Sequence, residues 1–95
     1  MDLTEDQIED QEQPKMYLIN NTLFVFNHVI SREMLQVDKN EVFNVVAPFL
    51  TEIQNETFLE YRKLKFVYAP LLSKVGVSAF HMCYALSYLK ADNIQ

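Results

Sequence analysis

Three side chains could serve as a nucleophile, a base or a metal ligand: Cys83, His28 and His81. A Cys–His pair is reactive when thiol and imidazole meet, and structural zinc takes about four such ligands. His81 and Cys83 lie two positions apart, so on a helix their side chains would point about 200° away from each other. The apolar neighbours of Cys83 should also raise the pKa of its thiol and make it inert. We therefore predict no metal site, no cofactor and no catalytic residue.

Glu52, Glu56 and Glu60 recur at every fourth position. Paired carboxylates perform acid–base chemistry when they face each other across a cleft. On one helix these three would instead share an exposed, solvated face. The chain has one glycine and no nucleophile-elbow motif, so it also lacks the usual phosphate-binding loop and serine nucleophile. We do not predict an enzyme.

Arg62, Lys63 and Lys65 stand among the aromatic residues of segment 61–68. Basic groups contact phosphates and aromatic rings stack on bases, so these three are candidate nucleic-acid contacts. Three charges support only weak, salt-dependent binding, and the net charge of the chain is −5. Nucleic acid is therefore the alternative reading. In a second form of it, the acidic N-terminus competes for a basic nucleic-acid-binding site on another protein.

The most apolar segment, residues 79–89, has only two polar side chains. A helix that is apolar on all sides must be surrounded by its own fold or covered by another chain, and a domain this small surrounds a helix with difficulty. Aromatic residues are enriched in the cores of interfaces. The predicted partner-binding residues are Phe80, His81, Tyr84 and Tyr88, with the two tyrosines on one helix face.

These residues must be positioned by the elements around them, and the apolar spacing favours helices. Apolar residues recur at helical intervals over residues 16–37 and again over 50–71. Asp38 and Ser78 are placed to cap two further helices. No glycine occurs between residues 15 and 75, which weighs against hairpins and bulges. We predict an all-α bundle of about four helices without internal repeats.

An α+β fold with the order β-β-α-β-α stays open beside it. Residues 16–19 and 22–26 flank Asn20-Asn21, and asparagine tolerates the positive φ of a tight hairpin turn. Residues 61–68 are also rich in strand-forming side chains.

Charge divides the 95 residues into a tail and a body. Residues 1–14 hold six acids and no base, whereas residues 15–95 hold eight bases and seven acids, so the tail carries −6 and the body +1. The tail has too few apolar residues to fold, so we predict a disordered tail, dispensable for folding, and a single domain over residues 15–95.

The predicted function is a non-catalytic protein-interaction module: an adaptor, regulatory subunit or inhibitor that binds another protein or a second copy of itself as a homodimer. A lone cysteine in so small a domain, with no visible signal peptide, favours an intracellular location, cytoplasmic or nuclear. No apolar run reaches the roughly 20 residues of a membrane helix, so no membrane partner is predicted.

Overall fold

The computed structural model describes residues 13–92 and consists of short strands joined by tight turns. The elements in chain order are β1 (Met16–Ile19), β2 (Thr22–Val25), β3 (Val29–Ile30), the 3₁₀ helices η1 (Arg32–Met34) and η2 (Lys39–Glu41), β4 (Asn44–Val46), β5 (Glu52–Ile53), β6 (Phe66–Tyr68), β7 (Lys74–Val75) and β8 (Tyr88–Lys90). The described residues contain no helix longer than one 3₁₀ turn. The predicted all-α bundle is therefore wrong.

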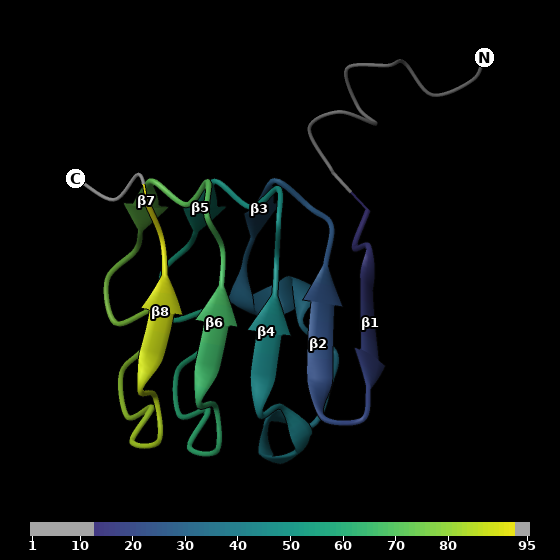
Figure 1. The fold of residues 1–95 in the computed structure, drawn as a ribbon, viewed down its shortest axis with the longest axis vertical. Coiled ribbons are helices and arrows are strands. Elements are labelled where there is room, and N and C mark those ends of the chain that lie inside the picture. Colours follow the sequence, from purple (N-terminus) through teal and green to yellow (C-terminus); the bar gives the residue numbers. More distant parts are fainter. Residues whose placement is uncertain (1–12, 93–95) are drawn as a thin grey trace.

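The strands form two facing sheets (Figure 1). One is a five-stranded sheet of order β1-β2-β4-β6-β8, parallel except for the antiparallel β1–β2 pair. The other is a parallel three-stranded sheet of order β3-β5-β7. The chain passes alternately from one sheet to the other, so each circuit adds one strand to each sheet. This is a β-solenoid, in which successive coils stack along one axis.

Each coil is 22 residues long, because the register places Leu23, Val45, Val67 and Leu89 beside one another. We define coil 1 as residues 22–43, coil 2 as 44–65 and coil 3 as 66–87; β8 begins the next turn. Coils 2 and 3 also repeat in sequence, which corrects the prediction of no internal repeats. Identical residues 22 positions apart are Val45/Val67, Ala47/Ala69, Pro48/Pro70, Leu50/Leu72, Phe58/Phe80 and Leu64/Leu86.

Successive tight turns explain why the apolar spacing imitated a helix. In coil 2 the N–H groups of Leu50, Thr57, Tyr61 and Leu64 each donate to the carbonyl three residues earlier. Turns of this kind return a side chain to the interior about every third residue, which is close to the spacing of a helix face. The helix predicted over residues 50–71 and the helix predicted to begin at Ser78 are therefore wrong. These segments form corners and short strands of the coils.

The hairpin of the α+β alternative is present. Asn20 and Asn21 join β1 to β2 and have φ angles of 51° and 67°. Positive φ at both central residues is what a two-residue hairpin turn of type I′ requires. Of the strand considered over residues 61–68, only Phe66–Tyr68 is a strand, as β6. Residues 13–92 contain neither of the α-helices of that alternative. Asp38 does cap, since its Oδ1 accepts the Asn40 N–H at 2.9 Å, but the capped element is the single turn η2.

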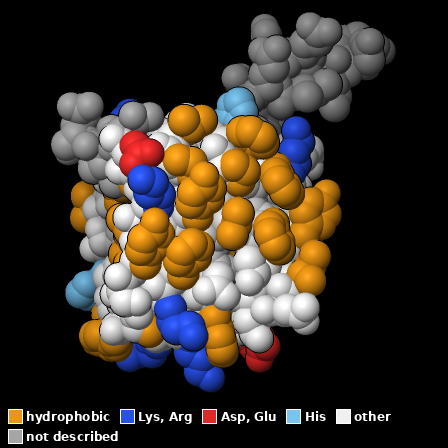
Figure 2. All heavy atoms as spheres, viewed as in Figure 1, with side chains coloured by type: hydrophobic (Ala, Val, Ile, Leu, Met, Phe, Trp, Pro, Cys, Tyr) orange, Lys and Arg blue, Asp and Glu red, His pale blue; other side chains and the backbone are white. Residues whose placement is uncertain are grey.

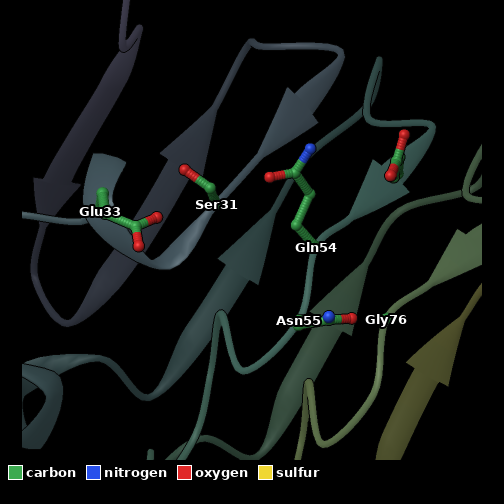
Figure 3. Close-up of a pocket in the computed structure, with 6 residues that line it drawn as sticks. Ser31, Glu33, Gln54, Asn55 and Gly76 are labelled. Atoms are coloured by element: carbon green, nitrogen blue, oxygen red, sulfur yellow. The ribbon is translucent and has the colours of Figure 1, made fainter.

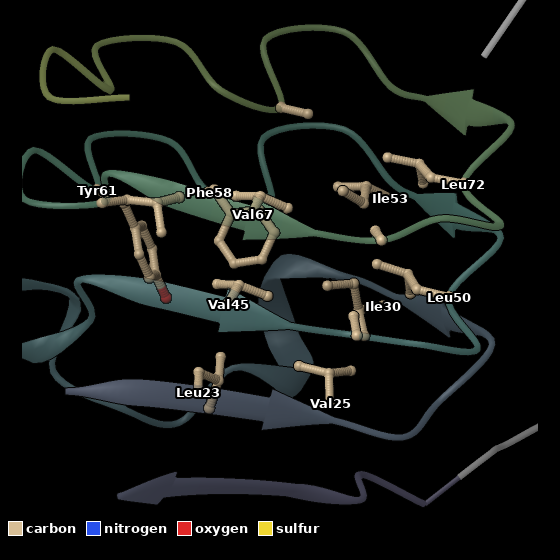
Figure 4. Close-up of a cluster of buried hydrophobic side chains, with 14 of the residues drawn as sticks. Leu23, Val25, Ile30, Val45, Leu50, Ile53, Phe58, Tyr61, Val67 and Leu72 are labelled. Atoms are coloured by element: carbon tan, nitrogen blue, oxygen red, sulfur yellow. The ribbon is translucent and has the colours of Figure 1, made fainter. Parts of the chain in front are cut away.

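The core lies between the two sheets (Figure 4). Side chains alternate along β2, β4 and β6, so Leu23 and Val25 of β2 and the middle residues of β4 and β6 point inward. They meet side chains from β3, β5 and the turns. The fully buried large residues include Leu23, Ile30, Leu50, Ile53, Phe58, Leu64 and Leu72.

The predicted tail, residues 1–14, falls largely outside the described residues. Its last two residues are described, and the Gln13 carbonyl accepts a hydrogen bond from the Asn27 side chain at 2.7 Å. Within residues 13–92 no helix has the length and apolar character needed to cross a bilayer.

Candidate binding surface on the five-stranded sheet

The outer surface of the five-stranded sheet is apolar and largely aromatic. Because Leu23 and Val25 of β2 point inward, Phe24 between them points outward, and so do the residues beside it in the sheet. We call this surface the aromatic face. Its members are Tyr17, Ile19, Phe24, Phe26, Val46, Phe49, Phe66, Tyr68, Leu71 and Tyr88.

Apolar side chains cover this face in a continuous patch (Figure 2). Tyr17 is 58% exposed and Phe49 is 50% exposed, so the patch is open to solvent. Ring contacts join its members: Tyr17 to Phe26 with centroids 6.2 Å apart, Phe26 to Phe49 at 6.4 Å, and Phe66 stacked on Tyr88 at 4.9 Å. Monomeric soluble proteins rarely leave contiguous apolar patches of several hundred Å² exposed, so this patch is a candidate binding surface.

Basic side chains gather along the lower edge of the face in this view (Figure 2). The ammonium groups of Lys63 and Lys65 lie 6.0 and 5.6 Å from the centroid of Phe43, and the Arg62 guanidinium lies 5.5 Å from that of Tyr84. Arg62 also lies 3.9 Å from Glu60, whereas no carboxylate within residues 13–92 comes within ion-pair distance of Lys63 or Lys65. The three predicted basic residues thus lie together near the lower edge of the aromatic face.

The four residues predicted to bind a partner do not share a face. Tyr88 belongs to β8 and the aromatic face, with 47% of its surface exposed. Phe80 packs on Phe58, with ring centroids 5.6 Å apart, at the open end of the core. Tyr84 is exposed in a turn below the sheet, and His81 uses its carbonyl to accept the Glu60 N–H. The grouping on one face assumed a helix that begins at Ser78, and the structure has turns and β8 in its place.

Cys83 is partly buried and packs against the core. Its thiol donates to the Phe58 carbonyl at 3.0 Å, and burial raises the pKa of this thiol. The predicted direction of that shift is confirmed. The described residues contain no group of three or more His, Cys, Asp or Glu side chains arranged to hold a metal ion.

The three glutamates lie at different places rather than on one helix face. Glu56 pairs with Arg32 at 3.1 Å and Glu60 with Lys39 at 3.2 Å. The hydrogen bond and charge of Lys39 lower the pKa of Glu60. Glu52 projects from β5 on the three-stranded sheet.

A polar hollow of about 410 Å³ lies beside the three-stranded sheet (Figure 3). It is lined by Ser31, Glu33, Glu52, Gln54, Asn55 and Gly76. The Asn55 side-chain carbonyl already accepts the Val77 N–H at 2.7 Å, so this group joins coil 2 to coil 3. Two of the lining side chains, Glu33 and Glu52, are carboxylates, and the others are uncharged.

Sequence reasoning missed the aromatic face because its members are scattered along the chain. Only the period of 22 brings Phe24, Val46 and Tyr68 into one row. The Ala-Pro pairs at residues 47–48 and 69–70 were the visible sign of that period.

Comparison of the chain with protein-family models, with curated proteins and with solved structures finds no match.

Proposed function

We propose that this protein is a non-catalytic interaction module that binds another protein through the aromatic face. The observation that carries the proposal is the continuous exposed patch of aromatic and aliphatic side chains on the five-stranded sheet (Figure 2). Stacked coils turn short strands into an extended surface, and solenoids with repeats of 20–29 residues, leucine-rich repeats among them, bind partners on such surfaces. Rigid aromatic side chains are also the commonest anchors of protein interfaces.

The charge around the face indicates the chemistry of the partner. Lys63 and Lys65 extend from its lower edge, and no carboxylate among residues 13–92 lies within ion-pair distance of either. At the opposite edge Lys90 is paired with Asp92 at 3.0 Å. We therefore propose a partner segment that combines apolar anchors with acidic residues, because rim charges of opposite sign steer association.

A nucleic-acid partner fits the same surface less well. Stacking on bases requires ring faces open to solvent, but Phe66 and Tyr88 stack on each other with planes 6° apart. Val46 and Leu71 add aliphatic area that a base does not need. Basic side chains gather along the lower edge of the face, and those at its upper corners lie apart from them, so they form no continuous path across it (Figure 2).

The test uses two short fluorescent peptides in which Phe and Leu alternate with Glu in one and with Lys in the other. The glutamate peptide should bind more tightly and shift the amide resonances of β1, β2, β6 and β8. Tyr17→Ser and Tyr88→Ser should each weaken it about tenfold, the loss expected of an anchor. Tyr84→Ser is the matched control, because Tyr84 is 70% exposed but lies outside the face. An equal loss in this control would contradict the proposal.

The basic edge is tested in the same assay. Replacing Lys63 and Lys65 together by Gln should reduce the preference for the glutamate peptide, whereas Lys74→Gln on the three-stranded sheet should not. A single-stranded oligonucleotide that binds more tightly than the glutamate peptide, with affinity falling steeply as salt rises, would replace this proposal by the nucleic-acid one.

A further inference from the structure

The outer edge of β1 is open among the residues that the structure describes. β1 is the first strand of the five-stranded sheet, and β2 is its one neighbour there (Figure 1). Tyr17 and Ile19 are 58% and 56% exposed, and Leu18 is 36% exposed. Exposed edges are usually protected by charged residues, prolines or bulges, but Met16–Ile19 contains none of these. The edge is therefore suited to pair with a strand from another chain.

The backbone of β1 directs both donors and acceptors to this edge. The Phe26 N–H donates to the Lys15 carbonyl at 2.9 Å, so Lys15 faces β2 in a hydrogen-bonded pair. Such pairs alternate with non-hydrogen-bonded ones along an antiparallel ladder, so Tyr17 also turns its backbone groups toward β2. The N–H and carbonyl groups of Met16 and Leu18 therefore point to the open edge. A second copy of β1 that runs antiparallel supplies a partner for each of them.

A hollow beside β1 matches the side chain that a second copy would bring. The hollow has a volume of about 200 Å³ and is lined by Pro14, Met16, Met34, Gln36 and Val37. Met16 packs against the core, so the hollow lies on the inner side of β1, and Leu18 points to the same side. When two copies pair antiparallel about Tyr17, Leu18 of one copy stands opposite Met16 of the other. Each Leu18 side chain therefore meets the hollow of the other copy.

We propose that two copies of this protein pair through the outer edges of β1, antiparallel about a two-fold axis at Tyr17. The same strand carries the Leu18 side chain and borders the hollow, so the contact is self-complementary, as a two-fold interface requires. The two five-stranded sheets become one continuous sheet, and the two aromatic faces meet at the paired Tyr17 rings.

The length of the contact determines how tightly the copies associate. Pro14 has no N–H to donate, so the ladder between the copies ends before it. A contact of this length buries less than the roughly 1,200 Å² of a stable complex, so the dimer should form reversibly and at high concentration. This proposal does not rest on the proposed function.

The first test mixes isotope-labelled and unlabelled full chain at about 1 mM. Tyr17 of the two copies forms a close, non-hydrogen-bonded pair, so a nuclear Overhauser effect should join the labelled and unlabelled Tyr17 Hα atoms. Amide exchange at Met16 and Leu18 should slow as the concentration rises from about 10 μM to about 1 mM.

Three results would overturn the proposal. The chain could remain monomeric at about 1 mM, or its contacts could join β1 to β8 of another copy. Protection of the Met16 and Leu18 amides could also be independent of concentration and be lost on deletion of residues 1–12, which would assign the edge to that segment.

The second test compares substitutions by sedimentation equilibrium. Leu18→Asp would bring a carboxylate to a largely apolar hollow and should weaken dimerisation about tenfold or more. Leu18→Met keeps the side-chain volume and should retain the dimer. Leu71→Asp is the control, because Leu71 is 45% exposed on the aromatic face but lies away from β1. If Leu71→Asp abolishes dimerisation and Leu18→Asp does not, the faces pair instead of the edges, and the proposal is wrong.

The same variant separates this proposal from the proposed function. Leu18 is not part of the aromatic face, so Leu18→Asp should bind the glutamate peptide as the original protein does when both are at about 10 μM, where the chain is monomeric. A protein that dimerises without binding the peptide, or binds it without dimerising, would contradict one proposal and leave the other standing.

Discussion

Phe58 and Phe80 stand 22 residues apart and stack with their ring centroids at 5.6 Å and their planes 12° apart. The Phe80 ring lies at the open end of the core and is partly exposed, whereas the Phe58 ring is fully buried. The same side chain in the same position of two coils thus has two environments, and the difference is due only to the coil above.

Truncating these two rings should therefore have unequal effects. Phe58→Ala removes a fully buried ring and should lower the free energy of unfolding by about 3–5 kcal/mol. Phe80→Ala should cost distinctly less, because part of its surface already meets solvent. Urea unfolding of both variants gives the comparison, and equal losses would show that the end is not open in solution.

Gly76 should not tolerate a side chain. A Cβ at this position would lie 2.5 Å from the Asn55 nitrogen and 2.7 Å from the Gln54 carbonyl carbon, both backbone atoms of the coil below. Gly76→Ala should destabilise the protein by about 1–3 kcal/mol through overpacking. Val77→Ala is the control, because that side chain is 74% exposed and should change stability by less than about 0.5 kcal/mol.

Removal of the N-terminal segment should depend sharply on where the cut is made. Deleting residues 1–14 removes the Gln13 carbonyl that accepts from buried Asn27, and an unsatisfied buried amide costs about 1–3 kcal/mol. Deleting residues 1–12 retains this carbonyl and should leave the unfolding midpoint in urea nearly unchanged. Equal midpoints for the two deletions would show that the Gln13–Asn27 bond contributes nothing. That residues 1–14 are dispensable for folding stays a prediction, and these two deletions test it.

Tyr61 should make the protein sensitive to alkali. Burial raises the pKa of its phenol from 10.0 to about 12. A phenol with a raised pKa in the folded state adds stability that is complete below pH 10 and is lost as the pH rises toward 12. Chemical unfolding across this interval should show the loss, and Tyr61→Phe, which cannot ionise, should show less of it. If Tyr61→Phe loses as much stability over this pH interval as the original protein, ionisation of Tyr61 is not the cause of the loss.

Asp38→Ala should destabilise the protein by about 0.5–2 kcal/mol, because the Asn40 N–H loses its acceptor. Asp38→Asn keeps an acceptor oxygen and should retain most of the stability. Thermal unfolding of the pair separates the cap from the charge.

Local chemistry could be read from the sequence, but the arrangement of the coils could not. The Asn20-Asn21 turn, the Asp38 cap and the raised pKa of Cys83 depend on near neighbours, and each was visible as a motif or a composition. The helices were wrong because turns that close over three residues and a helix place apolar side chains at similar intervals. Tyr88 was selected for the binding surface, but its companions on the face come from other coils.

The period of 22 was hard to detect because coil 1 follows it loosely. From Ile30 to Ile53 the spacing is 23 residues, and coil 1 has no Ala-Pro pair. Coils 2 and 3 alone provide the comparison, and their identical residues are mostly the buried ones. The exposed positions of coils 2 and 3 carry different residues. A sequence comparison that gives all positions equal weight therefore does not detect the repeat.

The stacking of coils also determines how the molecule should respond to force. The hydrogen bonds that join coils 2 and 3 connect residues about 22 apart, and each coil rests only on its neighbours. Tension applied between the chain ends would therefore detach coils one at a time instead of rupturing the whole domain together. Each detached coil would release roughly 75 Å of extended chain. The protein should therefore extend in successive steps of similar length, one for each coil that detaches.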